Sequence, residues 1–208
     1  MFSGSIVAIA TPFRDGVVDE TKLRELVEYQ IHKGTNGIVP CGTTGESPTL
    51  THEEHDRVIE ICIEAAQGRV PIIAGTGSNS TAEAIQLTQH ATKAGANGAL
   101  IVSPYYNKPT QEGLYRHFRA IANNTDIPII LYNIAGRTAV NIEPSTIARL
   151  AHDCRNIIGV KEASGSLDQM QTIKNLCPED FILLSGDDAL LLPVLSIGGV
   201  GVISVAPT

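Results

Sequence analysis

The sequence has no tryptophan, only 4% aromatic residues and no run of basic residues among its 15 lysines and arginines. Because 22 acidic residues give a formal charge of −7, it lacks the positive surface that binds nucleic acid or anionic lipid. It also lacks an apolar stretch approaching the ~20 residues of a membrane span, and residues 1–10 have no basic segment like that of a signal peptide. We therefore expect a cytoplasmic protein with no nucleic-acid or membrane partner.

Cysteine is scarce and has no pairing pattern. The four cysteines are widely spaced: Cys41, Cys62, Cys154 and Cys177. Disulfide-stabilised domains are shorter and richer in cysteine, so we expect four reduced thiols in or near the core. No motif indicates a metal, because His52 and His55 do not have the spacing of a His-Glu-x-x-His zinc site. Taken alone, these two histidines are typical of a solvated helix face.

What the sequence has in abundance is short apolar runs. Hydrophobic residues make up 43% of the 208 positions, enough for a sizeable packed core. Most runs begin roughly 25 to 34 residues after the previous one, which is the period of a βα unit. They are continuously apolar, as in strands buried on both faces of a parallel sheet. The eight runs are residues 6–9, 37–39, 71–74, 99–102, 128–131, 157–160, 181–184 and 200–203.

Helix signals separate these runs. Apolar residues recur at helical spacing over residues 21–33, and Gly34 ends that segment. Thr51 and Glu54 have the spacing of a capping box that opens the next helix. Pro144 stands where the first turn of a later helix begins. The strand and helix signals therefore alternate along the chain.

Eight βα repeats favour a single-domain (β/α)8 TIM barrel over residues 1–208. A doubly wound sheet usually has a glycine fingerprint after its first strand, but residues 11–13 read Thr-Pro-Phe. Such a barrel typically needs ~250 residues, and the chain stops just past the eighth run. We therefore expect the N-terminal portion of a longer protein, with the eighth helix and the C-terminal helical region missing and apolar surface exposed along the first and last strands.

Polar and aromatic side chains gather directly after the runs. In such a barrel the carboxyl ends of the strands meet at one rim, where active sites lie. The sequence therefore predicts an active site formed by this group. Its members include Thr43, Thr44, Tyr105, Tyr106, Tyr132, Arg137, Lys161 and Gly186.

Lys161 is the centre of the predicted site because it directly follows a buried strand. Desolvation lowers the pKa of a lysine, and a neutral amine can form a Schiff base with a carbonyl. Tyr132 ends the neighbouring strand and is placed to shuttle protons. The turn at residues 42–45 offers hydroxyls and backbone N–H groups to a carboxylate, and Arg137 offers a bidentate guanidinium to a second one. Such chemistry requires no metal or organic cofactor.

Each of these residues has an ordinary structural alternative when it is taken alone. Lys161 would extend to solvent or pair with Glu162, and Tyr132 would be a core aromatic. The turn at residues 42–45 would be a plain strand–helix connection, and Arg137 a surface arginine. Their convergence on one rim favours catalysis.

Five motifs together carry a resemblance to a known family. They are Gly42-Thr43-Thr44-Gly45-Glu46, Pro104-Tyr105-Tyr106-Asn107-Lys108-Pro109, Leu131-Tyr132-Asn133, Arg137-Thr138 and Gly159-Val160-Lys161-Glu162-Ala163. The chain resembles, along its whole length, the dihydrodipicolinate synthases of the pyruvate-dependent class I aldolase family, which also includes N-acetylneuraminate lyase. The Thr-Thr pair and Arg137 favour the synthase over the lyase.

The resemblance implies condensation of pyruvate with L-aspartate 4-semialdehyde to 4-hydroxy-tetrahydrodipicolinate, the first committed step of the diaminopimelate route to lysine. Lys161 would form the Schiff base, without a cofactor. A proton relay would consist of Tyr132, Thr43 and Tyr106, with Tyr106 reaching in from a neighbouring subunit of a homotetramer, a dimer of dimers. The implied substrate-binding residues are Thr44, Arg137, Gly186 and Ile203.

The resemblance also implies a site for lysine as a feedback inhibitor at a dimer interface. The matching residues are Ser47, Pro48, His52, His55, Asn79, Glu83 and Tyr105. This changes the interpretation of the two histidines, one of which would contact the inhibitor. Two alternatives to the synthase stay open: a sibling aldolase acting on N-acetylneuraminate or 2-keto-3-deoxygluconate, and a catalytically silent barrel fragment.

The loop that carries Arg137 departs from the family pattern. The family has x-Pro-x-Arg after Tyr-Asn, and this chain has Ile134-Ala135-Gly136-Arg137. Losing the proline removes a conformational restriction, so we expect a looser placement of the arginine. Ala139 stands where the family has glycine, which puts a side chain where the backbone favours positive φ.

Overall fold

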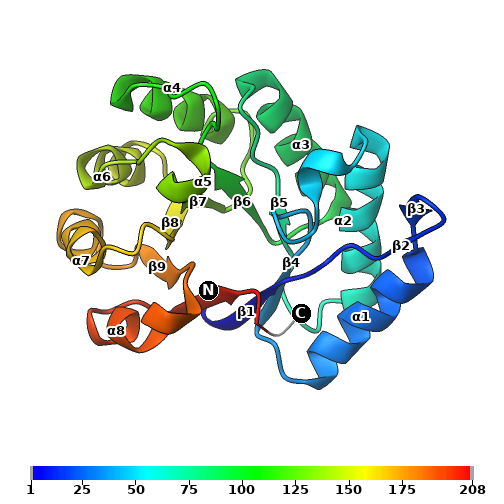
Figure 1. The fold of residues 1–208 in the computed structure, drawn as a ribbon. Helices are drawn as coiled ribbons and strands as arrows, with labels where there is room; N and C mark the ends of the chain where they lie inside the picture. The colour runs from blue at the N-terminus through cyan, green and yellow to red at the C-terminus, as the bar shows by residue number, and fades with distance from the viewer. Residues whose placement is uncertain (1, 207–208) are drawn as a thin grey trace.

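Eight parallel strands form a closed barrel in the computed structural model, which describes residues 2–206 (Figure 1). Their order is β4-β1-β10-β9-β8-β7-β6-β5. A parallel bridge between Ile38 and Ile72 joins β4 to the segment leading into β5, which closes the barrel. All eight predicted strands are confirmed. They are β1 (Gly4–Ala8), β4 (Gly37–Val39), β5 (Ile73–Gly75), β6 (Gly98–Val102), β7 (Ile129–Asn133), β8 (Ile157–Glu162), β9 (Ile182–Ser185) and β10 (Gly201–Ser204).

Seven helices connect successive strands and form the outer ring in Figure 1. They are α1 (Glu20–His32), α2 (His52–Ala66), α3 (Thr81–Ala94), α4 (Gln111–Ala122), α6 (Pro144–Asp153), α7 (Leu167–Leu176) and α8 (Leu191–Ser196). The predicted capping box of Thr51 and Glu54 is present, and Pro144 opens α6. Three short turns complete the helical elements: η1 (Ser47–Thr49), α5 (Ala135–Thr138) and η2 (Asp188–Leu190). The architecture is the TIM barrel that the repeats predict.

A small hairpin lies outside the eight predicted strands. Strands β2 (Phe13–Arg14) and β3 (Val17–Val18) pair antiparallel outside the barrel. Two residues are too few for a hydrophobic pattern, but their connection carries a recognisable signal. Asp15 and Gly16 both have positive φ, at 54° and 84°, as in the Asp-Gly turns favoured by two-residue hairpins.

The core has an inner and an outer layer. Alternate strand residues such as Ile6, Leu100 and Ile130 fill the barrel interior, and the intervening residues pack beneath the helices. The expected apolar exposure along the first and last strands is wrong, since Val7 and Val202 are both buried. Val7 belongs to the cluster that packs against α1.

The four cysteines are free and buried, as predicted. Desolvation raises the pKa of Cys62 to about 12 and that of Cys177 to about 11, so both favour the thiol form. None of the helices within residues 2–206 has the length and apolar character needed to cross a membrane.

Candidate active site

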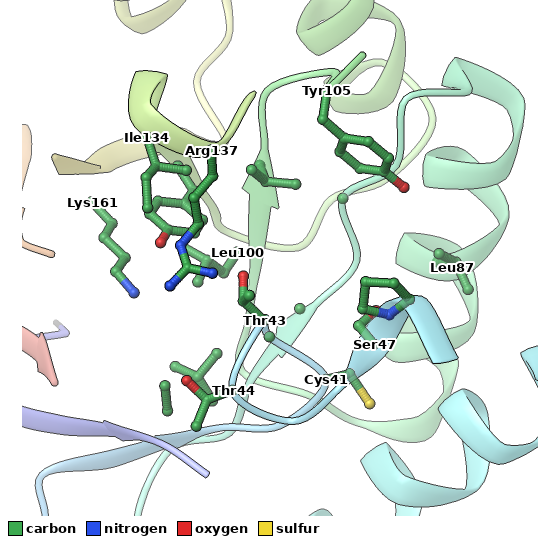
Figure 2. Close-up of a pocket in the computed structure, with 18 of the residues that line it drawn as sticks. Cys41, Thr43, Thr44, Ser47, Leu87, Leu100, Tyr105, Ile134, Arg137 and Lys161 are labelled. Carbon is green, nitrogen blue, oxygen red and sulfur yellow. The ribbon is translucent and has the colours of Figure 1, made fainter. Parts of the chain in front are cut away.

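A cavity of about 720 Å³ opens at the carboxyl ends of the strands, where the sequence predicts the site. Figure 2 shows Lys161 and Arg137 pointing into one part of this cavity, with Thr43 and Thr44 on its wall. Tyr105, Leu87 and Ser47 lie in the other part. The cavity brings together most of the predicted site residues: Thr43, Thr44, Ser47, Pro48, His52, His55, Glu83, Tyr105, Tyr132, Arg137, Lys161 and Gly186.

Lys161 is buried at the end of β8, with only 5% of its surface exposed. Its Nζ lies 4.3 Å from the centroid of the Tyr132 ring. The pKa of Lys161 is lowered to about 8, chiefly by burial; the Asp188 charge acts in the opposite direction, and the Arg137 charge adds a smaller lowering. The side chain therefore has a sizeable neutral fraction at mildly alkaline pH, which is the form that attacks carbonyls.

Tyr132 lies beside Lys161 because β7 and β8 are paired in parallel register. Residue 132 is opposite residue 161 in that pairing, and both side chains face the barrel interior. Burial raises the pKa of the Tyr132 hydroxyl, and the nearby Arg137 charge partly offsets the rise. The phenol therefore keeps its proton at neutral pH and can both donate and accept hydrogen bonds.

The turn after β4 places Thr43 and Thr44 on the cavity wall. It is held by hydrogen bonds from Glu46 N to Thr43 O (3.1 Å) and from the Thr11 hydroxyl to Gly45 O (2.7 Å). A Cβ at Gly45 would lie 3.1 Å from both Cys41 N and Ile9 O, closer than real Cβ contacts usually come. Glycine therefore allows the turn to pack against the barrel and present its two hydroxyls.

Arg137 lies on the single turn α5, directly after β7. The turn is closed by bonds from Arg137 N to Ile134 O (3.0 Å) and from Ala139 N to Ala135 O (2.9 Å). Ala139 has a φ of 59°, so a side chain does occupy the left-handed position that the family gives to glycine. The guanidinium lines the cavity and is exposed, as befits a group at the entrance.

Glu162 is the alternative partner that the sequence offers for Lys161, and that alternative is wrong. No ion pair joins the two residues, because neighbours on a strand point to opposite faces. Glu162 is fully buried on the outer face of β8 and accepts three N–H hydrogen bonds. The signal was the motif itself, in which a carboxylate directly follows a buried lysine.

The second part of the cavity contains the residues matched to the lysine site. His52 Nε2 lies 2.8 Å from Glu83 Oε1, and the Ser78 hydroxyl donates to the other carboxylate oxygen of Glu83. The interpretation of both histidines as solvated is wrong for His55, which is buried with its Nε2 2.9 Å from Gly75 O. Desolvation lowers the pKa of His55.

Three predicted site residues do not line the cavity. Tyr106 is 90% exposed and has a φ of 68°, so its ring projects away from its own barrel. Ile203 is buried in the barrel interior. Asn79 contributes its carbonyl to a hydrogen bond from Asn107 instead. Across the described residues, no group of three His, Cys, Asp or Glu side chains is arranged to hold a metal ion.

Comparisons with known proteins agree with this architecture. The model of the dihydrodipicolinate synthetase family matches residues 1–208. A 4-hydroxy-tetrahydrodipicolinate synthase of Syntrophus aciditrophicus is 64% identical over 205 residues, which are 99% of this chain and 70% of that protein. One from Endomicrobium trichonymphae has the same identity and coverage.

Solved structures give the same result. The dihydrodipicolinate synthase of Aquifex aeolicus superposes with a TM-score of 0.97 at 54% identity, covering 99% of this chain and 70% of that one. The enzyme of Cyanidioschyzon merolae, solved with lysine bound, gives 0.96 at 48% identity with the same coverage. The chain belongs to the dihydrodipicolinate synthetase family.

Proposed function

We propose that this chain is a cytoplasmic, cofactor-free lyase that condenses pyruvate with L-aspartate 4-semialdehyde to 4-hydroxy-tetrahydrodipicolinate. The observation that carries the proposal is Lys161, a buried amine that faces the cavity beside a tyrosine ring. Its pKa of about 8 provides the nucleophile that a Schiff base needs. The family relationship supplies the substrates.

The reaction follows from the neutral amine of Lys161. It attacks C2 of pyruvate, whose carbonyl oxygen takes up two protons and leaves as water, so that a C=N bond replaces the C=O bond. The imine acidifies C3, which loses a proton to give an enamine, and C3 then attacks the aldehyde carbon. The aldehyde oxygen is protonated to a hydroxyl. The amino group of the former semialdehyde finally attacks C2 and displaces Lys161, which closes the six-membered ring.

The residues around Lys161 transfer the protons and bind the substrate carboxylates in these steps. Tyr132, whose ring lies against the amine, shuttles protons with Thr43. Thr44 holds the pyruvate carboxylate, and Arg137 at the entrance holds the carboxylate of the semialdehyde. Gly186 and Ile203 contribute backbone groups to the pocket, which is compatible with the burial of the Ile203 side chain in the barrel interior.

Tyr106 completes the relay in the site of a neighbouring subunit. Its exposed ring lies outside its own cavity and is therefore free to reach another chain. The assembly in which it acts is a homotetramer, a dimer of dimers. Mixing Tyr106→Phe chains with Lys161→Met chains tests this role, because each interface between unlike chains then contains one intact site and one inactive site. Recovery of activity on mixing supports the assignment, and its absence contradicts it.

Lysine is the proposed feedback inhibitor of this site. The cluster that would receive it consists of Ser47, Pro48, His52, His55, Asn79, Glu83 and Tyr105. The Glu83 carboxylate, already paired with His52, is the group that would bind an amino group. A loss of condensation rate on adding lysine, weakened by Glu83→Gln, supports this role. An unchanged rate contradicts it.

The substrate assignment is tested by assaying the chain with pyruvate and aspartate semialdehyde in parallel with cleavage of N-acetylneuraminate and 2-keto-3-deoxygluconate. Cyclic product from the first pair alone supports the proposal. Cleavage of either sugar acid at a higher rate identifies a sibling aldolase, and turnover of none identifies a silent barrel.

A further inference from the structure

The fully buried carboxylate of Glu162 has no part in the chemistry described above, yet it directly follows the Schiff-base lysine in β8. A buried carboxylate is costly unless its oxygens are satisfied. No basic side chain of residues 2–206 forms an ion pair with Glu162. Its stabilisation comes instead from N–H donors, so both of its oxygens act as acceptors.

The three donors come from three different elements. Ser164 N, in the loop after β8, donates to Oε1 at 2.7 Å. Asn133 Nδ2, at the end of β7, donates to Oε2 at 2.8 Å. Gln169 Nε2, in the first turns of α7, donates to the same oxygen at 3.0 Å. The carboxylate therefore ties together the ends of two strands and the beginning of the next helix.

The register of β7 and β8 places this network directly behind the Tyr132–Lys161 pair. Tyr132 is opposite Lys161, and Asn133 is opposite Glu162. The first pair faces the cavity, and the second pair is linked by a hydrogen bond on the outer face. The outer bond therefore fixes the two strand ends on which the Tyr132 and Lys161 side chains are mounted.

The same network reaches the segment that carries Arg137. Asn141, three residues beyond the α5 turn, accepts from Asn133 Nδ2 at 2.8 Å and donates to Gln169 Oε1 at 2.8 Å. The backbone N–H of Ile142 donates to Asn133 Oδ1 at 3.0 Å. The exit of the Arg137 loop is therefore anchored to the amides that bind Glu162.

We propose that Glu162 is a positioning residue: through Asn133 it sets the Tyr132–Lys161 pair, and through Gln169 and Asn141 it sets the Arg137 loop. The inference rests on the proposed function, because the quantity that Glu162 controls is the reactivity of Lys161 toward pyruvate. Catalysis falls steeply when reacting groups are displaced by about an ångström.

Glu162→Gln tests this role with minimal change of shape. The amide would keep one acceptor for Ser164 N but place an NH₂ group against the donors of Asn133 and Gln169. We expect borohydride trapping of pyruvate on Lys161 to slow at least about tenfold at saturating pyruvate, well below the melting temperature. Glu179→Gln removes an exposed acid and is the matched control, with trapping as in the unmodified chain.

Gln169→Met provides a second variant that leaves the bond between Asn133 and Glu162 in place and alters a half-buried helix residue. It removes the two hydrogen bonds between Gln169 and Asn141, so that the Asn141 side chain is held by Asn133 alone. We therefore expect the KM for aspartate semialdehyde to rise about threefold or more with pyruvate trapping little changed. If the network were merely structural, Gln169→Met would lower the melting temperature but would not raise the KM for aspartate semialdehyde selectively over the rate of pyruvate trapping.

The outcomes separate the two claims. An adduct in the unmodified chain, with slow trapping in Glu162→Gln and a raised KM in Gln169→Met, supports the inference. The same adduct with normal trapping in Glu162→Gln and a normal KM in Gln169→Met overturns this inference alone. Absence of any adduct in the unmodified chain overturns the proposed function and, with it, the inference.

Discussion

Gly186 and Lys161 pack so closely that a Cβ at Gly186 would lie 3.0 Å from Cε of the lysine. The same Cβ would lie 2.7 Å from Cβ of Ala163. Gly186 therefore leaves the space through which the lysine side chain reaches the cavity. The absence of a side chain at the end of β9 is as much a requirement of the site as the amine itself.

Gly186→Ala is therefore expected to displace Lys161. We predict at least about a tenfold slower formation of the pyruvate adduct and a loss of about 1–3 kcal/mol in the free energy of unfolding from overpacking. Stopped-time borohydride trapping and urea denaturation measure the two effects. Gly136→Ala is the control, because nothing lies within 4 Å of a Cβ there. Normal trapping in Gly186→Ala would contradict the steric argument.

The burial of Lys161 predicts the pH dependence of Schiff-base formation. An amine reacts when it is neutral, so the trapping rate should rise with pH through the folded-state pKa. That pKa is about 8, against an ordinary value of 10.5. We expect a midpoint near pH 8 for the trapping rate at saturating pyruvate. A rate that still rises steeply above pH 10 would show that the lysine is solvated.

Stability gives an independent check on the same burial. Because the pKa of Lys161 is lowered on folding, the unfolded chain binds more protons between pH 8 and pH 10.5, and the cost of burying the ammonium is greatest below pH 8. Lys161→Met should therefore raise the free energy of unfolding by roughly 3 kcal/mol at pH 7. The gain should fade as the pH approaches 10.5. An equal gain in the free energy of unfolding at pH 7 and at pH 10.5 would contradict the burial of a Lys161 with a lowered pKa.

Arg137→Ala should separate the two substrates. The guanidinium stands at the entrance and is the proposed partner of the semialdehyde carboxylate. We predict a KM for aspartate semialdehyde raised at least about tenfold, with pyruvate trapping within about threefold of the unmodified rate. Its charge also lowers the pKa of Lys161, so the trapping midpoint should move to higher pH. Equal losses with both substrates would place Arg137 with pyruvate instead.

Ala139 stands in the left-handed region at the end of α5, with a φ of 59°. A non-glycine residue there costs roughly 1–2 kcal/mol in backbone strain. Glycine would relieve this strain, but its larger unfolded-state entropy would cancel part of the gain. Ala139→Gly should therefore stabilise the chain by up to about 1 kcal/mol, measured by urea denaturation. Ala120→Gly inside α4 is the control and should destabilise it by about 1 kcal/mol. Destabilisation by both variants would contradict the backbone assignment.

The barrel and the position of Lys161 were predictable because both follow from local sequence. Strands buried on both faces are continuously apolar, and the residue that follows such a strand lies at the rim. The burial of His55 could not be predicted in this way, because its hydrogen-bond partner, the carbonyl of Gly75, is distant in sequence. The role of Glu162 depends likewise on Asn133, 29 residues away. The environments of His55 and Glu162 depend on contacts between different helices, strands and loops, which the sequence pattern of a single element does not show.

The account depends on Lys161 forming a Schiff base, and reduction by borohydride in the presence of pyruvate tests this most directly. Intact-mass measurement and peptide mapping should find one reduced pyruvate per chain, attached to Lys161, and none in Lys161→Met. A folded chain that forms no adduct, or forms it on another lysine, would contradict the account.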